Sequence, residues 1–339
     1  MNRLKKNNEV YLNLVNEIRE IIHNARNDIA KTINTKLLET YWNIGKLIVE
    51  NEQKNKINPT SSRQIILELS KILSAELGKG FSRANLFNMR KFYLEYQDVQ
   101  TVSGQLSWSH YCELLIIDDK EKRAFYTKES INSKWSVREL KREINSSLYE
   151  RLLLSKGEVN KKDVLELSKK GMEITKAEDI IKSPYVFEFL GIPENKPLLE
   201  KDLELKLIRH IEEFLLELGK GFMFVGSQQR ITINNVHYYV DMVFYNKILK
   251  SYILIELKTR KLQISDAGQL NTYLNYYKTE VNDFDDNSPI GIILCAEKDE
   301  IAAEYILEGF DNNLFASKFV YVLPNKEELI KEIEKIMNE

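Results

Sequence analysis

Residues 239–259 read YVDMVFYNKILKSYILIELKT, two apolar runs rich in β-branched and aromatic residues around a short polar connection. Each run contains one carboxylate, Asp241 in the first and Glu256 in the second, and Lys258 follows two residues later. Side chains alternate along a strand, so Glu256 and Lys258 share one face of it. The pattern predicts two consecutive strands that carry charged groups inside an apolar sheet.

These charges indicate a metal-dependent phosphodiesterase site. A carboxylate inside an apolar strand is costly unless it is paired or bound to a metal. Carboxylates on consecutive strands can be neighbours, and their oxygens are ligands that suit Mg²⁺ or Mn²⁺. Such an ion lowers the pKa of a bound water, and Lys258 can orient that water or stabilise the charged transition state.

An alternative interpretation of the pattern is purely structural. Glu256 and Lys258 would form a surface pair on a half-exposed strand, and Asp241 would lie in a salt bridge beside a turn. Short D…E-x-K patterns arise readily by chance. The flanking elements favour the metal site, because a capped helix precedes the strands and a helix with Gln269 and Tyr273 follows them.

The segments around these strands predict a C-terminal α/β domain. The hydrophobic period changes from 3.6 to 2 after the glycine that closes the first helix, Gly219. The element order predicts a mixed sheet covered by helices on both faces. The expected elements are helices at 200–218, 264–278, 299–307 and 327–337, and strands at 222–228, 229–233, 237–245, 252–258, 289–296 and 319–323.

The N-terminal half is expected to be helical, with apolar residues at helical spacing over Val10–Ala30, Lys36–Glu50 and Ser62–Leu77. A fourth helix begins at Ser82 and interleaves basic residues with aromatic ones. Cations on phosphates and rings on bases would bind nucleic acid, whereas in the alternative the rings are core and the cations are solvated. The candidate cations are Arg83, Arg90 and Lys91.

Residues 106–154 are compatible with a helix-turn-helix. Glu121–Glu129 predicts one helix, and Ser136 with Glu139 forms a capping box that opens another. The second helix would lie in a major groove, although helical hairpins without a DNA role are far commoner. Its candidate contacts are Arg138, Lys141 and Arg142.

Composition sets the class of protein. The 339 residues are 43% hydrophobic and 29% charged, ordinary values for a soluble chain that can bury two cores. The net charge of −2 divides into +5 over residues 1–150 and −7 over 151–339, a modest excess that suits a polyanionic partner as well as it suits a solvated surface. Cys112 and Cys295 are the only cysteines, so a reducing cytoplasm is the expected setting.

A membrane partner is not expected, because no apolar run approaches the ~20 residues that span a bilayer. The N-terminus also lacks the apolar core of a signal peptide. A proline-containing segment near 155–185 suggests the domain boundary. The expected organisation is a helical nucleic-acid-binding domain at 1–155, a connector at 156–198 and a second domain at 199–339.

Four longer motifs extend the pattern to nearly the whole chain: LSWSHYCELL, AFYTKESINSKWSVRELKREI, FLLELGKGFMFVGSQQRI and VDMVFYN…ILIELK…AGQLNTYL. They resemble the bacterial YhcG-like family of the PD-(D/E)xK nuclease superfamily over roughly residues 10–335. The resemblance implies an all-α N-terminal domain followed by a restriction-endonuclease-like mixed sheet flanked by helices, an α+β and α/β two-domain chain.

The resemblance also implies site residues. The superfamily's aspartate falls on Asp241 and its E-x-K on Glu256 and Lys258, with the backbone carbonyl of Leu257 as a further metal ligand. A fourth acidic residue from the preceding helix would be Glu204 or, as the less favoured choice, Glu217. The superfamily's proline before the aspartate is replaced by Val240. Accessory positions are Gln269 and Tyr273, with Gln228 and Arg230 as phosphate contacts.

Two functions follow from different classes of protein. The first is a Mg²⁺- or Mn²⁺-dependent nuclease whose helical domain grips nucleic acid, with DNA as the expected substrate, while the α/β domain cuts it. The second is a non-catalytic protein that uses the nuclease-like fold to bind nucleic acid or recruit a partner. An intact Asp241, Glu256 and Lys258 favours the first. A homodimer or higher oligomer formed by the N-terminal domain is a further hypothesis.

Overall fold

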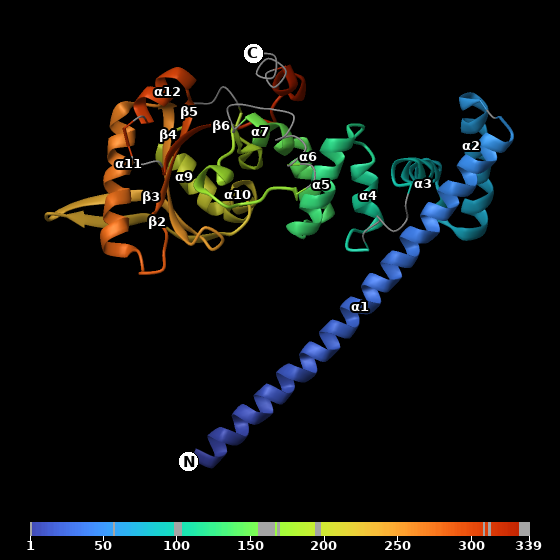
Figure 1. Ribbon diagram of the computed structural model, residues 1–339, viewed down its shortest axis with the longest axis horizontal. Coiled ribbons are helices and arrows are strands. Elements are labelled where there is room, and N and C mark those ends of the chain that lie inside the picture. Colours follow the sequence, from blue (N-terminus) through green and yellow to red (C-terminus); the bar gives the residue numbers. More distant parts are fainter. Residues whose placement is uncertain are drawn as a thin grey trace. The chain divides into compact units, whose positions relative to one another are not determined.

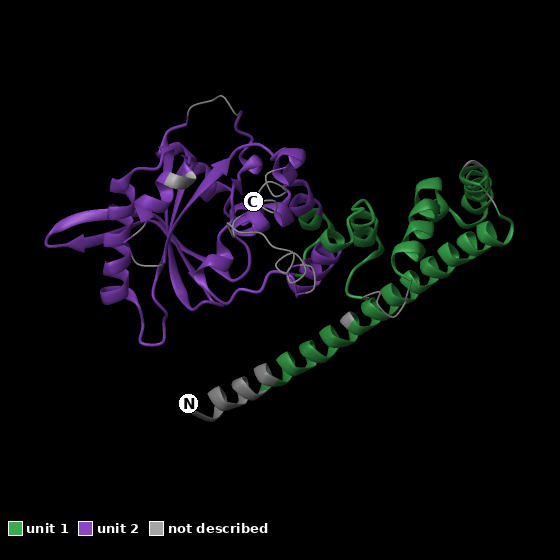
Figure 2. Ribbon diagram, turned by 45° about the horizontal axis from the view of Figure 1, so that its top comes forward, with its two compact units in different colours: residues 1–123, 134–140 green, residues 124–133, 141–339 purple. Residues whose placement is uncertain are grey.

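The computed structural model describes residues 2–56, 58–97, 104–154, 167, 170–193, 198–307, 309–310 and 313–331. The chain forms two compact units (Figure 2). Unit 1 comprises residues 1–123 and 134–140, and unit 2 comprises residues 124–133 and 141–339. No helix in the described part of the chain is long and apolar enough to cross a membrane.

Unit 1 is helical, as the sequence predicts, but its first helix is longer than expected. The two helices expected at 10–30 and 36–50 are one continuous helix, because Lys31–Thr35 contains neither proline nor glycine to end it. The next two helices begin at side-chain caps, Asn58 accepting from Ser61 N and Ser82 from Asn85 N. The helices are α1 (Asn2–Lys54), α2 (Pro59–Leu77), η1 (Lys79–Phe81), α3 (Arg83–Glu95) and α4 (Trp108–Leu114).

The core of unit 1 joins α1 to α2 and α3. Ile48, Ile66 and Met89 are buried together, and burying one such side chain contributes about 1.5–3 kcal/mol. Gly45 permits the close approach of α1 to α3, because a Cβ there would lie 2.0 Å from the carbonyl oxygen of Met89. Trp108 packs at 4.7 Å from the Tyr41 ring. These contacts fix only the C-terminal half of α1.

Three further helices follow α4, namely α5 (Lys120–Asn132), α6 (Val137–Asn145) and α7 (Leu148–Leu154). The predicted capping box at the start of α6 is present. Ser136 N donates to Glu139 Oε2 at 2.6 Å, and Glu139 N donates to Ser136 Oγ at 3.3 Å. The sequence also favours a charged helix over Asn160–Lys170, and this segment lies largely outside the described residues.

Unit 2 contains a six-stranded mixed sheet in the order β1-β6-β5-β4-β3-β2 (Figure 1). Strands β2, β3 and β4 are antiparallel, and β4, β5, β6 and β1 are parallel. This mixed sheet with flanking helices confirms the predicted fold class. The strands are β1 (Tyr185–Val186), β2 (Phe222–Ile233), β3 (Val236–Asn246), β4 (Ser251–Lys261), β5 (Ile290–Glu297) and β6 (Leu314–Val320).

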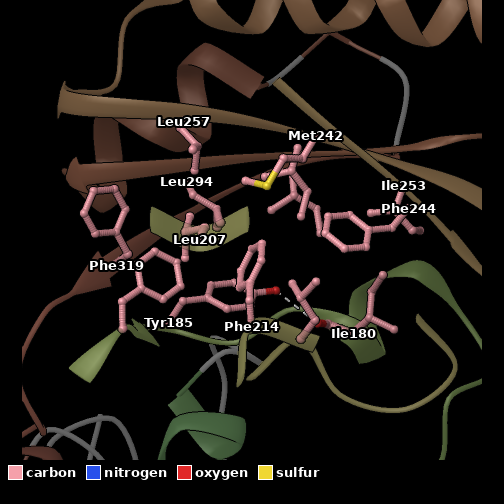
Figure 3. Close-up of a cluster of buried hydrophobic side chains, with 14 of the residues drawn as sticks. Ile180, Tyr185, Leu207, Phe214, Met242, Phe244, Ile253, Leu257, Leu294 and Phe319 are labelled. Atoms are coloured by element: carbon pink, nitrogen blue, oxygen red, sulfur yellow. Dashed lines mark hydrogen bonds between the residues drawn. The ribbon is translucent and has the colours of Figure 1, made fainter. Parts of the chain in front are cut away.

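Helices cover both faces of the sheet (Figure 1). On one face, α9 (Glu200–Arg209) and α10 (Ile211–Leu218) pack Leu207 and Phe214 against Phe244 and Leu294 (Figure 3). On the other face, α11 (Ile264–Tyr276) and α12 (Glu300–Leu307) pack on Val243, Leu254 and Ile293. The two apolar layers hold the middle of β4 between them, so Glu256 and Lys258 lie in a rigid and largely dry environment.

Several elements differ from the sequence-based expectation. The strands expected at 222–228 and 229–233 form the single strand β2. The last strand is Leu314–Val320 and not 319–323, since Pro324 follows closely and cannot donate to a ladder. The helix expected at 200–218 is interrupted at His210, which separates α9 from α10. The short strand β1 was not expected, because two residues carry no periodic signal. Most of the helix expected at 327–337 lies outside the described residues.

Candidate active site

Asp241 lies where β3 separates from β4. The last ladder pair between these strands is Met242 with Ile255. At the next position a side chain takes the place of a backbone acceptor. The Asp241 Oδ2 accepts a hydrogen bond from Leu257 N at 2.9 Å. The Asp241 Oδ1 accepts from Gln228 Nε2 at 3.2 Å. Burial raises the pKa of Asp241 despite these bonds, as expected for a carboxylate removed from water.

Glu256 is the most deeply placed charge of the site. Its side chain is 1% exposed, and its Oε2 accepts from Lys258 Nζ at 3.2 Å and from Gln269 Nε2 at 3.3 Å. Its Oε1 is buried and has no hydrogen-bond partner in the structure. Burial, followed by the charge of Asp241, raises the pKa of Glu256 to about 8. The Oε1 atom is therefore a buried acceptor that is free to contact a bound ion or a donor.

Lys258 is held beside the carboxylates. Its Nζ lies 3.2 Å from Glu256 Oε2 and 3.8 Å from Glu200 Oε2. Burial alone would lower the pKa of Lys258, but the charges of Glu256, Asp241 and Glu200 outweigh it and raise that pKa. The lysine is consequently a fixed positive charge at neutral pH and a donor.

Glu204 approaches the site from α9. Gln228 joins it to Asp241, because Gln228 Nε2 donates to Glu204 Oε2 at 2.8 Å and to Asp241 Oδ1 at 3.2 Å. Burial raises the pKa of Glu204, and the nearby Asp241 adds to this rise. Gln228 has a φ of +46°, a backbone conformation that residues other than glycine rarely adopt. The backbone is therefore strained at the residue whose side chain bridges the two acids.

The residues fit a divalent ion. Asp241 and Glu256 supply two converging carboxylates, one with an unsatisfied buried oxygen. The described residues include no group of three or more His, Cys, Asp or Glu side chains positioned to hold a metal. One or two carboxylates completed by waters and substrate phosphate are what Mg²⁺ normally takes, so two are sufficient.

The accessory residues predicted on the following helix reach the same site. Gln269 Nε2 donates to Tyr273 Oη at 2.9 Å as well as to Glu256. Gln269 and Tyr273 lie about one turn apart on α11, which brings both to the sheet. Arg230 is exposed on β2, opposite Tyr239 of β3. The structure thus brings seven predicted residues together where the β3–β4 ladder ends, namely Asp241, Glu256, Lys258, Glu204, Gln228, Gln269 and Tyr273.

Glu200 is part of this cluster and was not predicted. Its Oε1 accepts from Thr259 N at 3.2 Å, and its Oε2 faces Lys258. The signal was present in the sequence, because Glu200 precedes Glu204 by four residues and so shares its helix face.

Comparison with known proteins identifies the family. Residues 178–334 match the YhcG PDDEXK nuclease domain, and residues 17–151 match the DUF1016 N-terminal domain. The chain is 35% identical to “Putative nuclease YhcG” of Escherichia coli (strain K12) over 355 aligned residues, 95% of this chain and 93% of that protein. The chain belongs to the YhcG family. This assignment confirms the resemblance inferred from the motifs.

Two solved structures match part of this YhcG-family chain. A repair endonuclease from Pyrococcus abyssi is 19% identical over 39% of this chain and 50% of its own, with a TM-score of 0.27. The EndoMS-dsDNA2 complex is 18% identical over 40% of this chain and 51% of its own, also with a TM-score of 0.27. The matches span about half the length of each solved chain.

The alternative acidic residue, Glu217, lies in a different network of the YhcG-family fold. It is 0% exposed, and its Oε1 lies 2.5 Å from Arg151 Nη1 while its Oε2 lies 3.1 Å from Arg142 Nη2. Burial alone would raise the pKa of Glu217, but Arg151, Lys182 and Arg142 lower it to about 2. Of Glu204 and Glu217, it is Glu204 that is connected to Asp241, through Gln228.

The predicted nucleic-acid contacts of α3 are mostly engaged inside unit 1. Arg90 Nη2 pairs with Glu52 Oε2 at 2.8 Å, and Lys91 Nζ pairs with Asp118 Oδ1 at 2.8 Å. Arg83 lies over the Phe87 ring at 5.6 Å. Arg90 is therefore an internal ion-pair residue, in contrast to the exposed phosphate contact expected of it.

The predicted contacts of α6 differ from one another. Arg138 and Lys141 are exposed on the helix surface. Arg142 is 14% exposed and pairs with three carboxylates, those of Glu143, Glu188 and Glu217. These ion pairs hold the Arg142 guanidinium inside unit 2. The expectation that Arg142 contacts a DNA groove is therefore corrected.

Proposed function

We propose that this chain is a Mg²⁺- or Mn²⁺-dependent nuclease that hydrolyses phosphodiester bonds of DNA. Membership of a family with a PDDEXK nuclease domain supports the coarse function. The observation that carries the finer proposal is the buried, unpartnered Oε1 of Glu256 beside the Asp241 carboxylate. A buried carboxylate oxygen without a partner is destabilising unless the working protein supplies a cation or a donor to it.

Asp241 and Glu256 would hold the ion, with the Leu257 carbonyl and Glu204 as the additional ligands predicted from the family. When bound, such an ion lowers the pKa of a coordinated water and offsets the charge of a phosphate. Asp241 is pre-oriented by the Leu257 amide, and Glu256 by Gln269 and Lys258. Both ligands therefore lose little conformational freedom on binding.

Lys258 acts on the substrate in this proposal. Three carboxylates keep it protonated, so it can donate a hydrogen bond to the attacking water or to a non-bridging phosphate oxygen. Tyr273 reaches the site only through Gln269, which makes it a positioning residue. The dry surroundings of β4 strengthen each of these charge interactions.

The β2–β3 hairpin supplies a path for the nucleic acid. Its tip projects beyond the rest of the sheet (Figure 1). His237 and Tyr239 precede Asp241 on β3, and the register sets Arg230 opposite Tyr239. All three are exposed. We infer that Arg230 contacts a phosphate and that Tyr239 offers a ring on which a base or sugar packs.

Cleavage assays with the purified full chain test the proposal. Linear, circular and branched DNA and single-stranded RNA would be incubated with Mg²⁺, Mn²⁺ or EDTA. Asp241→Ala and Lys258→Ala should each lose at least about a hundredfold in rate, in line with the loss of an electrostatic catalytic group. Lys261→Ala is the matched control, because Lys261 lies on the same strand but pairs with Asp299 at the surface.

Cleavage that persists in EDTA, or equal rates in the wild type and both site variants, would refute a metal-dependent site. Metal-independent retention of DNA without cleavage would instead support the binding-only function. A preference for RNA would overturn the assignment of DNA as substrate.

A further inference from the structure

The N-terminal part of α1 carries an apolar stripe that no described part of unit 1 covers. It consists of eight side chains that are 42–68% exposed. They are related by spacings of three, four or seven residues, so they follow one face of the helix. Tyr11, Ile22 and Ile33 are spaced by eleven residues, which is close to three full turns of a straight helix. The stripe comprises Tyr11, Leu14, Val15, Ile18, Ile21, Ile22, Ile29 and Ile33.

The stripe lies on the face of α1 opposite to the one used inside unit 1. Leu38 is 1% exposed in the packed half of the helix, whereas Leu47 is 67% exposed. These two residues are separated by about two and a half turns and so point in opposite directions. Leu47 lies about five turns after Ile29, on the line of the stripe. The N-terminal half also extends past α2, α3 and α4 (Figure 2).

The size of the stripe matches a stable protein interface. Half-exposed side chains of this size present roughly 100 Å² each, so eight of them offer on the order of 800 Å², about what each partner of a standard interface buries. Exposed apolar patches of this area are uncommon on monomers. A helix of 53 residues is also far longer than the usual helix of a globular domain.

Charges along the two edges of the stripe are of opposite sign. Glu17 and Asp28 lie on one edge, about three turns apart, and Arg19 and Arg26 lie on the other, about two turns apart. None of these four forms an ion pair within the described residues. In a parallel pair of identical helices, each edge meets the opposite edge of its partner, whereas in an antiparallel pair like edges meet.

We propose that the stripe is the surface through which two copies of this chain associate, as a parallel coiled coil of their α1 helices. Eight apolar residues from each copy form the seam, and the acidic edge of one helix faces the basic edge of the other. The assembly carries two nuclease-like sheets, a number that suits action on both strands of a duplex. The self-association does not depend on the proposed activity.

The mass of the full chain in solution tests the association. Light scattering after size exclusion, at micromolar concentration, should give twice the 39.8 kDa of one chain. Ile18→Glu with Ile22→Glu should halve that mass. Asn16→Glu with His23→Glu, which adds the same charge to exposed positions off the stripe, should leave it unchanged. Circular dichroism would show whether each variant remains folded.

Cysteine cross-linking tests the orientation in a Cys112→Ser background. Tyr11→Cys should oxidise to a covalent dimer, because parallel helices bring the two copies of residue 11 together. Asn16→Cys, on another face, should stay monomeric under the same conditions. A monomeric wild type, or a dimer that survives both stripe substitutions, would overturn the proposal. A dimer that cross-links between Tyr11→Cys and Ile33→Cys but not at Tyr11→Cys alone would overturn the parallel arrangement.

Discussion

Glu256 shows how one side chain couples the site to stability. Its pKa is about 8 in the folded protein because of burial and the charge of Asp241, against an ordinary value of 4.5. A carboxyl with a raised folded pKa contributes its full stability below about pH 4.5, and this contribution is lost as the pH rises towards 8. Without a divalent ion, the wild type should therefore lose stability between pH 5 and pH 8.

Glu256→Gln should remove most of this pH dependence, because the amide stays neutral. Without metal at pH 8 the variant should be more stable than the wild type by up to about 4 kcal/mol, since one pKa unit corresponds to about 1.4 kcal/mol. At pH 5 the difference should be small. Urea denaturation in EDTA at both pH values measures it. Parallel pH profiles for the two proteins would contradict the shifted pKa.

Glu204 and Glu217 are acids of neighbouring helices with opposite expected roles. Glu204→Ala should reduce cleavage and metal affinity, since it removes a proposed metal ligand that Gln228 joins to Asp241, and should change stability little. Glu217→Ala should destabilise the fold by about 3–5 kcal/mol, because it leaves buried cations unpaired. Metal titration and urea denaturation of both variants separate the two effects. The reverse result would make Glu217 the site residue.

At the scale of elements, the β2–β3 hairpin links the sheet to the substrate. Arg230→Ala and Tyr239→Ala should each weaken DNA binding about five- to a hundredfold, the range expected for one phosphate contact or one stacked ring. Binding would be measured by anisotropy in a cleavage-deficient Asp241→Ala background. Lys247→Ala removes the same charge as Arg230→Ala at the far end of β3 and should bind normally. Unchanged affinity in both hairpin variants would place the nucleic acid elsewhere.

The elements that the sequence predicted well are those with a strong local period. The two strands at 237–245 and 252–258 and the helix from Ile264 were all predictable, because each is flanked by a turn and buried on a defined face. Strand alternation alone was enough to predict that the Glu256 and Lys258 side chains share one face of the strand. The same reasoning separated α1 into two helices, because the mainly polar stretch Lys31–Thr35 interrupts the apolar period although it contains no proline or glycine to end the helix.

What the sequence could not give depends on contacts between distant segments. Arg142 and Arg90 carry the same charge as Arg138, yet only the fold reveals that the first two meet buried carboxylates. The choice between Glu204 and Glu217 required the Gln228 bridge, which joins residues from three elements. Such pairings have no sequence spacing from which they could be predicted.

For the whole molecule, the predicted domain limits of 1–155, 156–198 and 199–339 stay a proposal that fragments can test. In unit 2, Arg151 is fully buried and pairs with Glu217, and β1 completes the sheet beside β6. Glu129 of α5 accepts from Met172 N at 2.7 Å and pairs with Lys220 at 2.9 Å. Segments before residue 199 are therefore built into the core of the sheet domain.

A fragment of residues 199–339 should consequently not fold stably, whereas 124–339 should unfold in one cooperative transition. The shorter fragment loses the cations that pair with Glu217, and it also loses Tyr185 and Phe187 from the core of the sheet domain, where each buried side chain contributes about 1.5–3 kcal/mol. It also uncovers the β6 edge. Thermal unfolding followed by circular dichroism compares the two fragments. If 199–339 melts as cooperatively and at the same temperature as 124–339, the buried network is not what secures the domain, and the boundary at 199 is the correct one.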